Sequence, residues 1–252
     1  MEAKKKVPLL NKIAYGVGTG GGCVFNQIAA AFLLNYYTDT ALIGAGAIAT
    51  MFLICRIFDG ISDLVMGGIV DKTNTRWGKA RPYILLGAAP FYASTALLYC
   101  GGLFFGSATS NDPRKIIFVF VMLFIQETFS TIYGIPRMHM LSMQTVNPND
   151  RIAVGLLQRY IGGTGSGIIY MLFAPIIDFN EKGYINFPMP TLYAVVAIIA
   201  SAVGIAGNMS MAVNCKERIM LQPKPAPLSK SLFYILKNKY MLRNTIANYS
   251  TM

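Results

Sequence analysis

The stretch that decides the fold is RIFDGISDLVMGGIVDKTNTRWGKARPY, residues 56–83. Its first half is apolar except for Arg56, Asp59 and Asp63, and its second half is a loop rich in lysine and arginine. Charged groups inside a long apolar helix are costly in a membrane, and basic loops follow membrane helices on the cytoplasmic side. The stretch is therefore typical of a membrane-spanning helix that carries a functional polar face and ends at a cytoplasmic loop.

The rest of the chain has the composition of a membrane protein. Charged residues make up only 13% of it, against about a quarter in an average soluble domain. A helix needs roughly 20 mostly apolar residues to cross the core of a bilayer. The sequence therefore predicts an all-α membrane protein with six transmembrane helices. We expect these spans at about residues 13–37, 47–70, 83–105, 116–141, 154–177 and 192–213.

The net charge of +11 does not indicate nucleic-acid binding, because the basic residues gather in alternate loops. The loops between them hold only Arg114, Lys115 and Lys182. The positive-inside rule therefore places both ends of the chain in the cytoplasm, where basic loops contact anionic lipid headgroups. The clustered residues are Lys4, Lys5, Lys6, Lys12, Lys72, Arg76, Lys79, Arg81, Arg137, Arg151 and seven more between positions 216 and 243.

The chain divides into three segments. Residues 1–215 are predicted to form one six-helix transmembrane bundle. Residues 216–240 contain QPKPAPL, which cannot continue a helix, so we interpret them as a cytoplasmic linker. Residues 241–252 have the pattern of the start of a seventh helix, truncated at Met252. We therefore expect a second six-helix bundle as the partner of this one.

Several other motifs point to packing and not to chemistry. The glycine runs at 15–22 (YGVGTGGG) and 162–167 (GGTGSG) lack the strand and the Lys-Ser/Thr of a phosphate-binding loop. We interpret them as surfaces for close helix packing. The four cysteines lack metal-ligand spacing and His139 is the only histidine, so no cofactor is expected. Four aromatic residues near span ends are interpreted as interfacial belts, namely Tyr36, Tyr37, Trp77 and Tyr83.

The charged residues of the second predicted span lie on one helical face. Arg56, Asp59 and Asp63 follow one another at spacings of three and four residues. An acid at the membrane centre costs roughly 2.5 to 3.5 kcal/mol, and one arginine cannot neutralise two carboxylates. The leftover charge suits a small cation such as Na⁺, or a proton. A purely structural cluster, tied to basic residues of other helices, is the alternative.

Three further charged residues belong to the fourth and fifth predicted spans. Glu127 lies midway along the fourth, Arg137 follows ten residues later, and Arg159 lies near the start of the fifth. Glu127 either pairs with an arginine from another helix or contacts a substrate. Pro136 is expected to kink the fourth span and to free backbone groups beside a cavity.

Four sequence runs together resemble the amino-terminal half of the glycoside-pentoside-hexuronide:cation symporter family, the melibiose permease-like transporters. They are YGVGTGGG, YYTD at 36–39, the stretch at 56–83 and QRYIGG from Gln158. The resemblance covers nearly the whole chain. It implies a twelve-helix major facilitator fold, of which this chain is the N-terminal bundle. The long stretch also contains a version of that superfamily's cytoplasmic loop motif, at Gly67, Asp71, Gly78, Lys79 and Arg81.

The resemblance implies roles for individual residues. Asp59 and Asp63 would bind the cation, which makes them the metal ligands if the ion is Na⁺. Thr131 would be a further oxygen ligand and Arg56 a neighbouring charge. Arg159 matches a family arginine near the sugar. Together with Arg137 and Glu127, it is expected to line the substrate cavity.

The predicted sugar site departs from that of the galactoside carriers in the family. They have an aspartate on the first helix, and an aspartate and a tryptophan on the fourth. This chain has Cys23, Gly134 and Met138 at those positions. The α-galactoside site is therefore not reproduced, and the loss of two acids leaves the site more positive. We expect another sugar of the class, with an anionic hexuronide bound at least as well as its neutral counterpart.

The sequence is thus interpreted as a secondary active transporter. It would carry a glycoside, pentoside or hexuronide together with Na⁺ or H⁺ by alternating access, without covalent chemistry. An intramembrane aspartyl protease needs acids that face each other from two helices, whereas Asp59 and Asp63 share one. A non-transporting receptor or lipid carrier on the same fold is the alternative. The chain alone is not expected to support coupled uptake, because such transporters bind substrate between two bundles.

Overall fold

Long helices account for most of residues 7–105, 112–184 and 186–217, the part of the chain that the computed structural model describes. They are α1 (Leu9–Asn35), the short π-helical η2 (Tyr36–Thr40), α2 (Ala45–Lys72), α3 (Arg81–Phe105), α4 (Pro113–Gln144), α5 (Pro148–Glu181) and α6 (Met189–Asn214). Within this part, the only extended pairing is an isolated bridge between Thr75 and Gly78. Most of the predicted linker, from residue 218 on, and the predicted seventh helix lie outside the described residues.

Each predicted span coincides with one of these helices, although the helices extend beyond the apolar runs. Polar caps explain part of the extension, since Asp112 accepts a hydrogen bond from the Arg114 N–H and Asn147 accepts one from the Asn149 N–H. In the described residues, α3, α4 and α6 are long and apolar enough to cross a membrane. Because α2 carries three charges along its middle, its insertion across a membrane depends on polar partners. The count of six spans stays a prediction.

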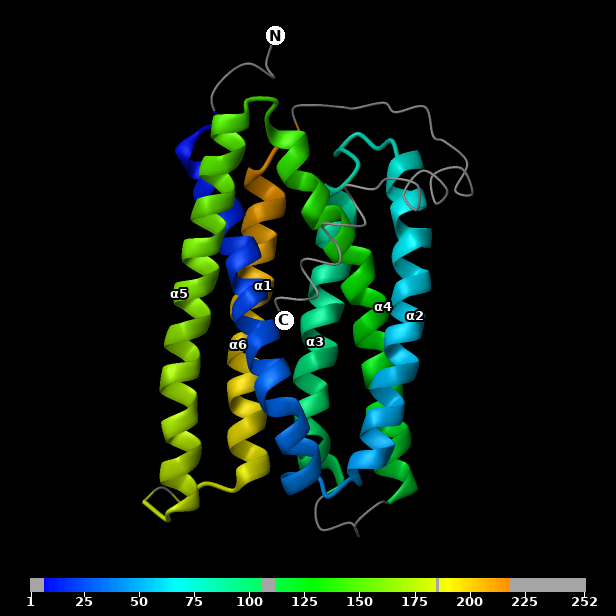
Figure 1. Ribbon diagram of the computed structural model, residues 1–252, viewed down its shortest axis with the longest axis vertical. Helices are drawn as coiled ribbons and strands as arrows, with labels where there is room; N and C mark the ends of the chain where they lie inside the picture. The colour runs from blue at the N-terminus through cyan, green and yellow to red at the C-terminus, as the bar shows by residue number, and fades with distance from the viewer. Residues whose placement is uncertain (1–6, 106–111, 185, 218–252) are drawn as a thin grey trace, which may run out of the picture.

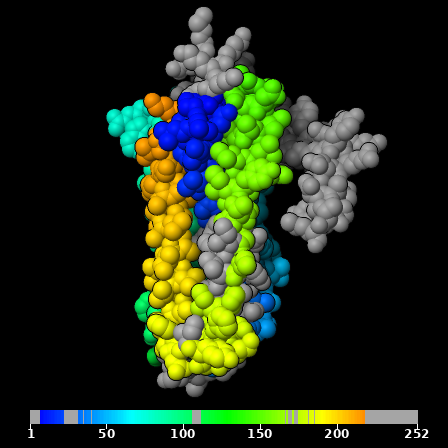
Figure 2. Space-filling view, turned by 90° about the vertical axis from the view of Figure 1, so that its left-hand side faces the viewer, coloured from blue at the N-terminus to red at the C-terminus, as the bar shows by residue number. Residues whose placement is uncertain are grey.

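The helices pack in a fixed order of neighbours (Figure 1). The α1 helix contacts α5 and α6, α3 contacts α6 and α4, and α2 packs mainly against α4. Helices α5 and α2 therefore stand at opposite ends of the series, and each leaves one side without an extensive helix contact in the described part. Figure 2 shows the first half of α1 filling the space between α5 and α6.

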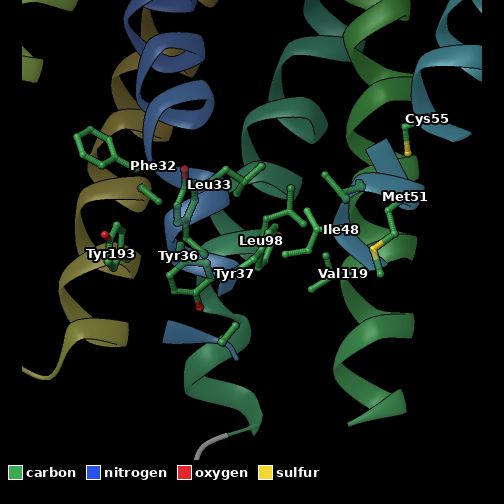
Figure 3. Packing of buried hydrophobic residues seen from close by; sticks show 14 of the residues in the cluster. Phe32, Leu33, Tyr36, Tyr37, Ile48, Met51, Cys55, Leu98, Val119 and Tyr193 are labelled. Carbon is green, nitrogen blue, oxygen red and sulfur yellow. The ribbon is translucent and has the colours of Figure 1, made fainter. Parts of the chain in front are cut away.

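Aromatic and aliphatic side chains together form the core where α1 runs into η2 (Figure 3). The rings of Tyr36 and Tyr193 lie 5.2 Å apart between centroids, and those of Tyr99 and Tyr193 stack at 6.2 Å. Tyr36 and Tyr37 are both 0% exposed, so the interpretation of these two residues as an interfacial belt was wrong. The Tyr36 hydroxyl instead accepts a hydrogen bond from the Gly102 N–H on α3, which gives a buried phenol the partner it requires.

The first glycine run packs as predicted, while the second does so only in part. A Cβ at Gly18 would lie 2.9 Å from the Gly207 carbonyl oxygen on α6, and one at Gly20 would lie 3.1 Å from the Gly162 nitrogen on α5. The absence of side chains thus lets α1 approach both neighbours. A Cβ at Gly163 or Gly167 would meet nothing within 4 Å, so that face of α5 is open in the described structure.

Candidate functional site

Three polar residues join α2 to α4 midway along α2. The Thr131 hydroxyl donates to Asp59 Oδ1 over 3.1 Å, and Ser62 Oγ lies 3.1 Å from Thr131 Oγ1. Ser62 also donates to the Asp59 backbone carbonyl over 3.0 Å. Thr131 is buried, whereas Asp59 and Ser62 are half-buried. The contact between the two helices therefore holds a compact group of oxygen atoms, one side of which is accessible.

An aromatic contact also joins α2 to α4 near this site. The rings of Phe58 and Phe124 lie 4.3 Å apart between centroids. Phe58 precedes Asp59, and Phe124 lies two helical turns before Thr131, on the same side of α4. The ring pair is thus a second contact between α2 and α4, about two turns of α4 before the Thr131 hydroxyl.

The charges around these oxygens do not cancel. Arg56 Nη1 lies 3.9 Å from Asp59 Oδ2, and the Arg56 side chain is 74% exposed, so this ion pair contributes little. Asp63 lies one turn after Asp59 on the same face of α2 and is half-buried. Glu127, one turn before Thr131 on α4, interacts electrostatically with Arg56, Asp59 and Asp63. When all are ionised, the carboxylates of Asp59, Asp63 and Glu127 exceed the Arg56 guanidinium by two negative charges.

This cluster, defined as Arg56, Asp59, Ser62, Asp63, Glu127 and Thr131, is suited to a small monovalent cation. In the described residues, no group of three or more His, Cys, Asp or Glu side chains is arranged to hold a metal. The oxygen atoms that the cluster does contain are those of carboxylates and hydroxyls, the hard ligands that small cations prefer. The same excess of negative charge favours protonation of one carboxyl group.

The second polar group centres on Arg137, one helical turn after Tyr133 on α4. Arg137 Nη1 donates to the Tyr133 hydroxyl over 3.2 Å, and the guanidinium carbon lies 5.0 Å from the centroid of the Tyr133 ring. On α1, a Cβ at Gly22 would overlap Arg137 Nη1. Arg137 therefore lies against α1 beside Cys23, one of the positions that the sequence assigned to the sugar. The side chain of Cys23 is outside the described part.

The remaining predicted sugar residues are accessible but are not drawn into one group. Met138 is 70% exposed, and a Cβ at Gly134 would meet nothing within 4 Å. Arg159 is exposed on α5 and has neither a hydrogen bond nor an ion pair with another described residue. Glu127 lies in the cluster with Asp59, and its arginine neighbour from another helix is Arg56. The structure thus brings Arg137 against α1 at Gly22 and leaves Arg159 apart.

The loop motif is held to the end of α6. The Glu217 carboxylate accepts hydrogen bonds from the backbone N–H groups of Lys79, Ala80 and Arg81 at 2.7, 2.7 and 3.1 Å. Arg81 in return donates from Nε to the Ala212 carbonyl over 2.7 Å. Gly78, at φ 112°, has its Cα against Glu217. Of the other motif positions, the Asp71 carbonyl accepts a hydrogen bond from Lys79 Nζ, and Gly67 faces open space.

Sequence reasoning missed several residues of these sites. Ser62 lies three positions after Asp59 and could have been found by extending the polar face of α2. Asn208 is a buried amide inside a very apolar helix, which is itself a signal for a polar partner. The contacts of Tyr133 and Glu217 depend on which helices are neighbours, and no local pattern contains that information.

Comparison with known proteins places the chain among sugar transporters. It matches the family of MFS/sugar transport proteins over residues 14–247. It is 25% identical to the isoprimeverose transporter of Lactiplantibacillus pentosus, over 93% of this chain and 48% of that protein. It is 29% identical to the glucuronide carrier protein homolog of Escherichia coli (strain K12), over 88% and 48%. With the putative glycoside/cation symporter YagG of the same organism it shares 32% identity, over 71% and 37%. The chain thus spans about half the length, or less, of these relatives.

Proposed function

This chain belongs to the family of MFS/sugar transport proteins, and from that premise we propose that it forms the amino-terminal bundle of a cation-coupled sugar symporter. The observation that carries the proposal is the oxygen cluster between α2 and α4, where Thr131 and Ser62 lie at hydrogen-bond distance around Asp59. A purely structural role needs no excess of negative charge there. A coupling ion, Na⁺ or H⁺, would remove that excess.

The proposed mechanism is alternating access. Ion binding at Asp59, Asp63 and Thr131 would neutralise part of the cluster, and this would make closure of the cavity around the sugar less costly. Sugar binding would stabilise the same closed state, so each ligand would raise the affinity for the other. The transporter would use six spans from this chain, with both ends in the cytoplasm, and a second bundle to complete the cavity. No step of this cycle makes or breaks a covalent bond.

The proposed cargo is a glycoside, pentoside or hexuronide. Arg137 and Arg159 supply positive charge without an aspartate at Cys23 or Gly134, so we favour a sugar that carries a carboxylate. A relative named as a glucuronide carrier homolog supports this class. A relative named for isoprimeverose is the reason to test a neutral sugar beside it.

The deciding experiment measures sugar affinity against Na⁺ concentration and pH in the full-length transporter that contains this chain. Asp59→Asn removes one charge at constant volume, and Asp63→Asn does the same one turn later. We expect each to abolish the stimulation of sugar binding by the cation and to stop uphill accumulation. Downhill exchange of sugar should partly survive, because the sugar site is separate from the acid pair.

The matched control is Asp178→Asn on α5, which breaks the exposed ion pair with Lys182. This variant should keep the full cation response. If folded Asp59→Asn and Asp63→Asn proteins also keep it, the acid pair is not the coupling site. If they lose folding and sugar binding together, the cluster is structural, and the receptor or lipid-carrier interpretation gains ground.

A further inference from the structure

Arg137 lies at the end of a chain of buried hydrogen bonds and ring contacts that crosses three helices. The chain begins on α6, where Asn208 Nδ2 donates to the Tyr92 hydroxyl over 2.9 Å. On α3, the Tyr92 ring lies 6.1 Å from the Tyr133 ring of α4 between centroids, and the Tyr133 oxygen accepts from Arg137 Nη1 over 3.2 Å. Asn208, Tyr92 and Tyr133 are each at most 2% exposed. The half-buried guanidinium is therefore the accessible end of an otherwise buried chain.

Packing fixes the inner part of this chain in place. A Cβ at Gly204 on α6 would lie 2.7 Å from Cδ1 of the Tyr92 ring, so the ring occupies the space that a side chain would need. Ser201 Oγ donates to the Tyr92 carbonyl over 2.9 Å. The rings of Phe91 and Tyr133 lie 4.9 Å apart between centroids. The Tyr133 hydroxyl thus has little freedom to move, and neither has the nitrogen that donates to it.

Arg137 and the hydroxyls of Tyr92 and Tyr133 face α1, next to an open space. A Cβ at Gly22 would lie 3.2 Å from the Tyr92 hydroxyl and 3.5 Å from that of Tyr133, so both hydroxyls and Arg137 meet at one point on α1. Beside it, the Gly134 position has nothing within 4 Å. A guanidinium has five N–H groups, and a carboxylate takes two of them in parallel. With Nη1 oriented by Tyr133, the remaining donors are available on the open side.

We propose that Tyr133, supported by Tyr92 and Asn208, is the positioning residue that orients Arg137 to bind the carboxylate of an acidic sugar. The inference rests on the proposed transport function and adds a specificity determinant to it. An arginine on a flexible stem loses side-chain entropy when it binds a ligand. An arginine already fixed by Tyr133 loses less, and therefore discriminates more strongly between a carboxylate and a hydroxymethyl group.

The test compares two sugars that differ only at this group, methyl glucuronide and methyl glucoside, bound to the full-length transporter at saturating cation. Tyr133→Phe removes the oxygen that accepts from Arg137 and keeps the ring. We expect it to weaken methyl glucuronide binding about tenfold, as for the loss of one hydrogen bond to a charged group. Methyl glucoside affinity should change less than twofold. Tyr92→Phe should give a smaller shift in the same direction.

Two further variants separate positioning from a general structural effect. In an Arg137→Gln background, adding Tyr133→Phe should change the affinity for neither sugar, because Tyr133 acts through Arg137. Tyr99→Phe, on the same helix as Tyr92 but in the cluster with Tyr36 and Tyr193, is the matched control and should leave the ratio of the two affinities unchanged.

The outcomes distinguish this inference from the proposed function. Equal losses for both sugars in Tyr133→Phe, no loss for either, or the same selective loss without Arg137 would each overturn the positioning role. The same holds if the wild type does not bind methyl glucuronide. Cation-stimulated binding of any sugar would leave the transport proposal standing in all of these cases, whereas a wild type that binds no sugar would remove both.

Discussion

At the scale of single residues, Glu127 supplies the second excess negative charge of the acid cluster. The sequence allowed two roles for it, a contact with substrate or a pair with an arginine from another helix. In the structure it interacts with Arg56, Asp59 and Asp63. Its charge should therefore act mainly on the coupling ion.

We predict that Glu127→Gln weakens cation binding about fivefold, which corresponds to about 1 kcal/mol of lost Coulomb attraction in a well-solvated site. Sugar affinity at saturating cation should stay within twofold of the wild type. The measurement is the concentration of Na⁺, or of H⁺, that gives half-maximal stimulation of sugar binding. A selective loss of sugar affinity at saturating cation would contradict this prediction and would indicate that Glu127 contacts the substrate.

Cys215, just beyond the last turn of α6, should be a chemically silent thiol in the folded protein. It is 0% exposed, and burial raises its pKa from the ordinary 9.0 to about 12. Since the thiolate is the reactive form, a protein with Cys215 as its single cysteine should resist maleimide labelling at pH 8 until it unfolds. The control thiol is a cysteine at exposed Lys216, which should react at once.

The same shift makes Cys215 destabilising at alkaline pH. Below pH 9 both states hold the proton and the thiol contributes no pH dependence. Between pH 9 and about 12 the unfolded chain releases it and the folded chain does not, so stability falls as pH rises. A Cys215→Ala protein should lose less stability over that interval, as followed by unfolding in detergent. Identical slopes in the two proteins would contradict the shift.

Residue spacing was enough to predict that Asp59 and Asp63 share one helical face. It did not predict which residues of other helices lie next to them. Asp59 and Asp63 share a face because of their four-residue interval, and the resemblance added Thr131. Ser62 satisfies the same helical geometry. Glu127 and Tyr133 gain their roles from contacts between different helices, and such contacts follow from the order of neighbours and not from local sequence.

At the scale of elements, the reciprocal capping of α3 and α6 should contribute measurably to the free energy of unfolding. Glu217 satisfies three N–H groups at the start of α3, while Arg81 satisfies carbonyls at the end of α6. Both interactions match the charge preferences of helix ends. We predict that Glu217→Ala destabilises the chain by about 1 to 2 kcal/mol, the range found for the loss of a helix cap.

Unfolding of the purified 252-residue chain in detergent would measure this effect, and amide exchange would locate it. The first turn of α3 should lose protection in Glu217→Ala and keep it in the control, Lys216→Ala, which removes an adjacent exposed side chain. If exchange at Ala80 and Arg81 is unchanged in Glu217→Ala, the carboxylate does not cap this helix.

Glycine and tyrosine show why element contacts were only partly predictable. Small residues at 15–22 indicated close approach, and Gly18 and Gly20 do lie against neighbouring helices. The equally small Gly163 and Gly167 face open space. Tyr36 and Tyr37 each have an apolar ring and a polar hydroxyl, which suit a membrane interface as well as a core. Lipid and helix surfaces are similarly apolar, so hydrophobicity alone does not tell a buried face from an exposed one.

At the scale of the whole molecule, α2 presents an apolar stripe away from the bundle. Leu53, Ile57 and Ile61 lie at successive turns and are 62%, 60% and 61% exposed. Next to them, a groove of about 370 Å³ between α2 and α4 is lined by apolar side chains, among them Ile54 and Phe120. The curated relatives are about twice as long as this chain. A second bundle on this side of α2 would cover the stripe, whereas the acid cluster lies on the face of α2 that meets Thr131 of α4.

We therefore predict that the 252-residue chain alone gives no coupled sugar uptake in liposomes, while a protein that adds the second bundle does. The chain should still fold, because its helices bury their own aromatic core. Folding is checked by the cooperative unfolding of purified protein, and uptake by labelled sugar under a Na⁺ or pH gradient. Uphill accumulation by the chain alone would contradict the prediction unless two copies assemble around a two-fold axis.

The bundle is closed by contacts between its earliest and latest parts. The Lys12 ammonium forms an ion pair with Asp150, and the Lys79 backbone N–H donates to the Glu217 carboxylate, each across 138 positions of sequence. Chains leave the ribosome amino end first, so α1 enters the bilayer long before α5 and α6, the two helices it packs against. Its bare glycine face must then be shielded for most of the time taken to synthesise the bundle. A mutation in α6 would accordingly expose α1 to quality-control proteases while the chain is still being made.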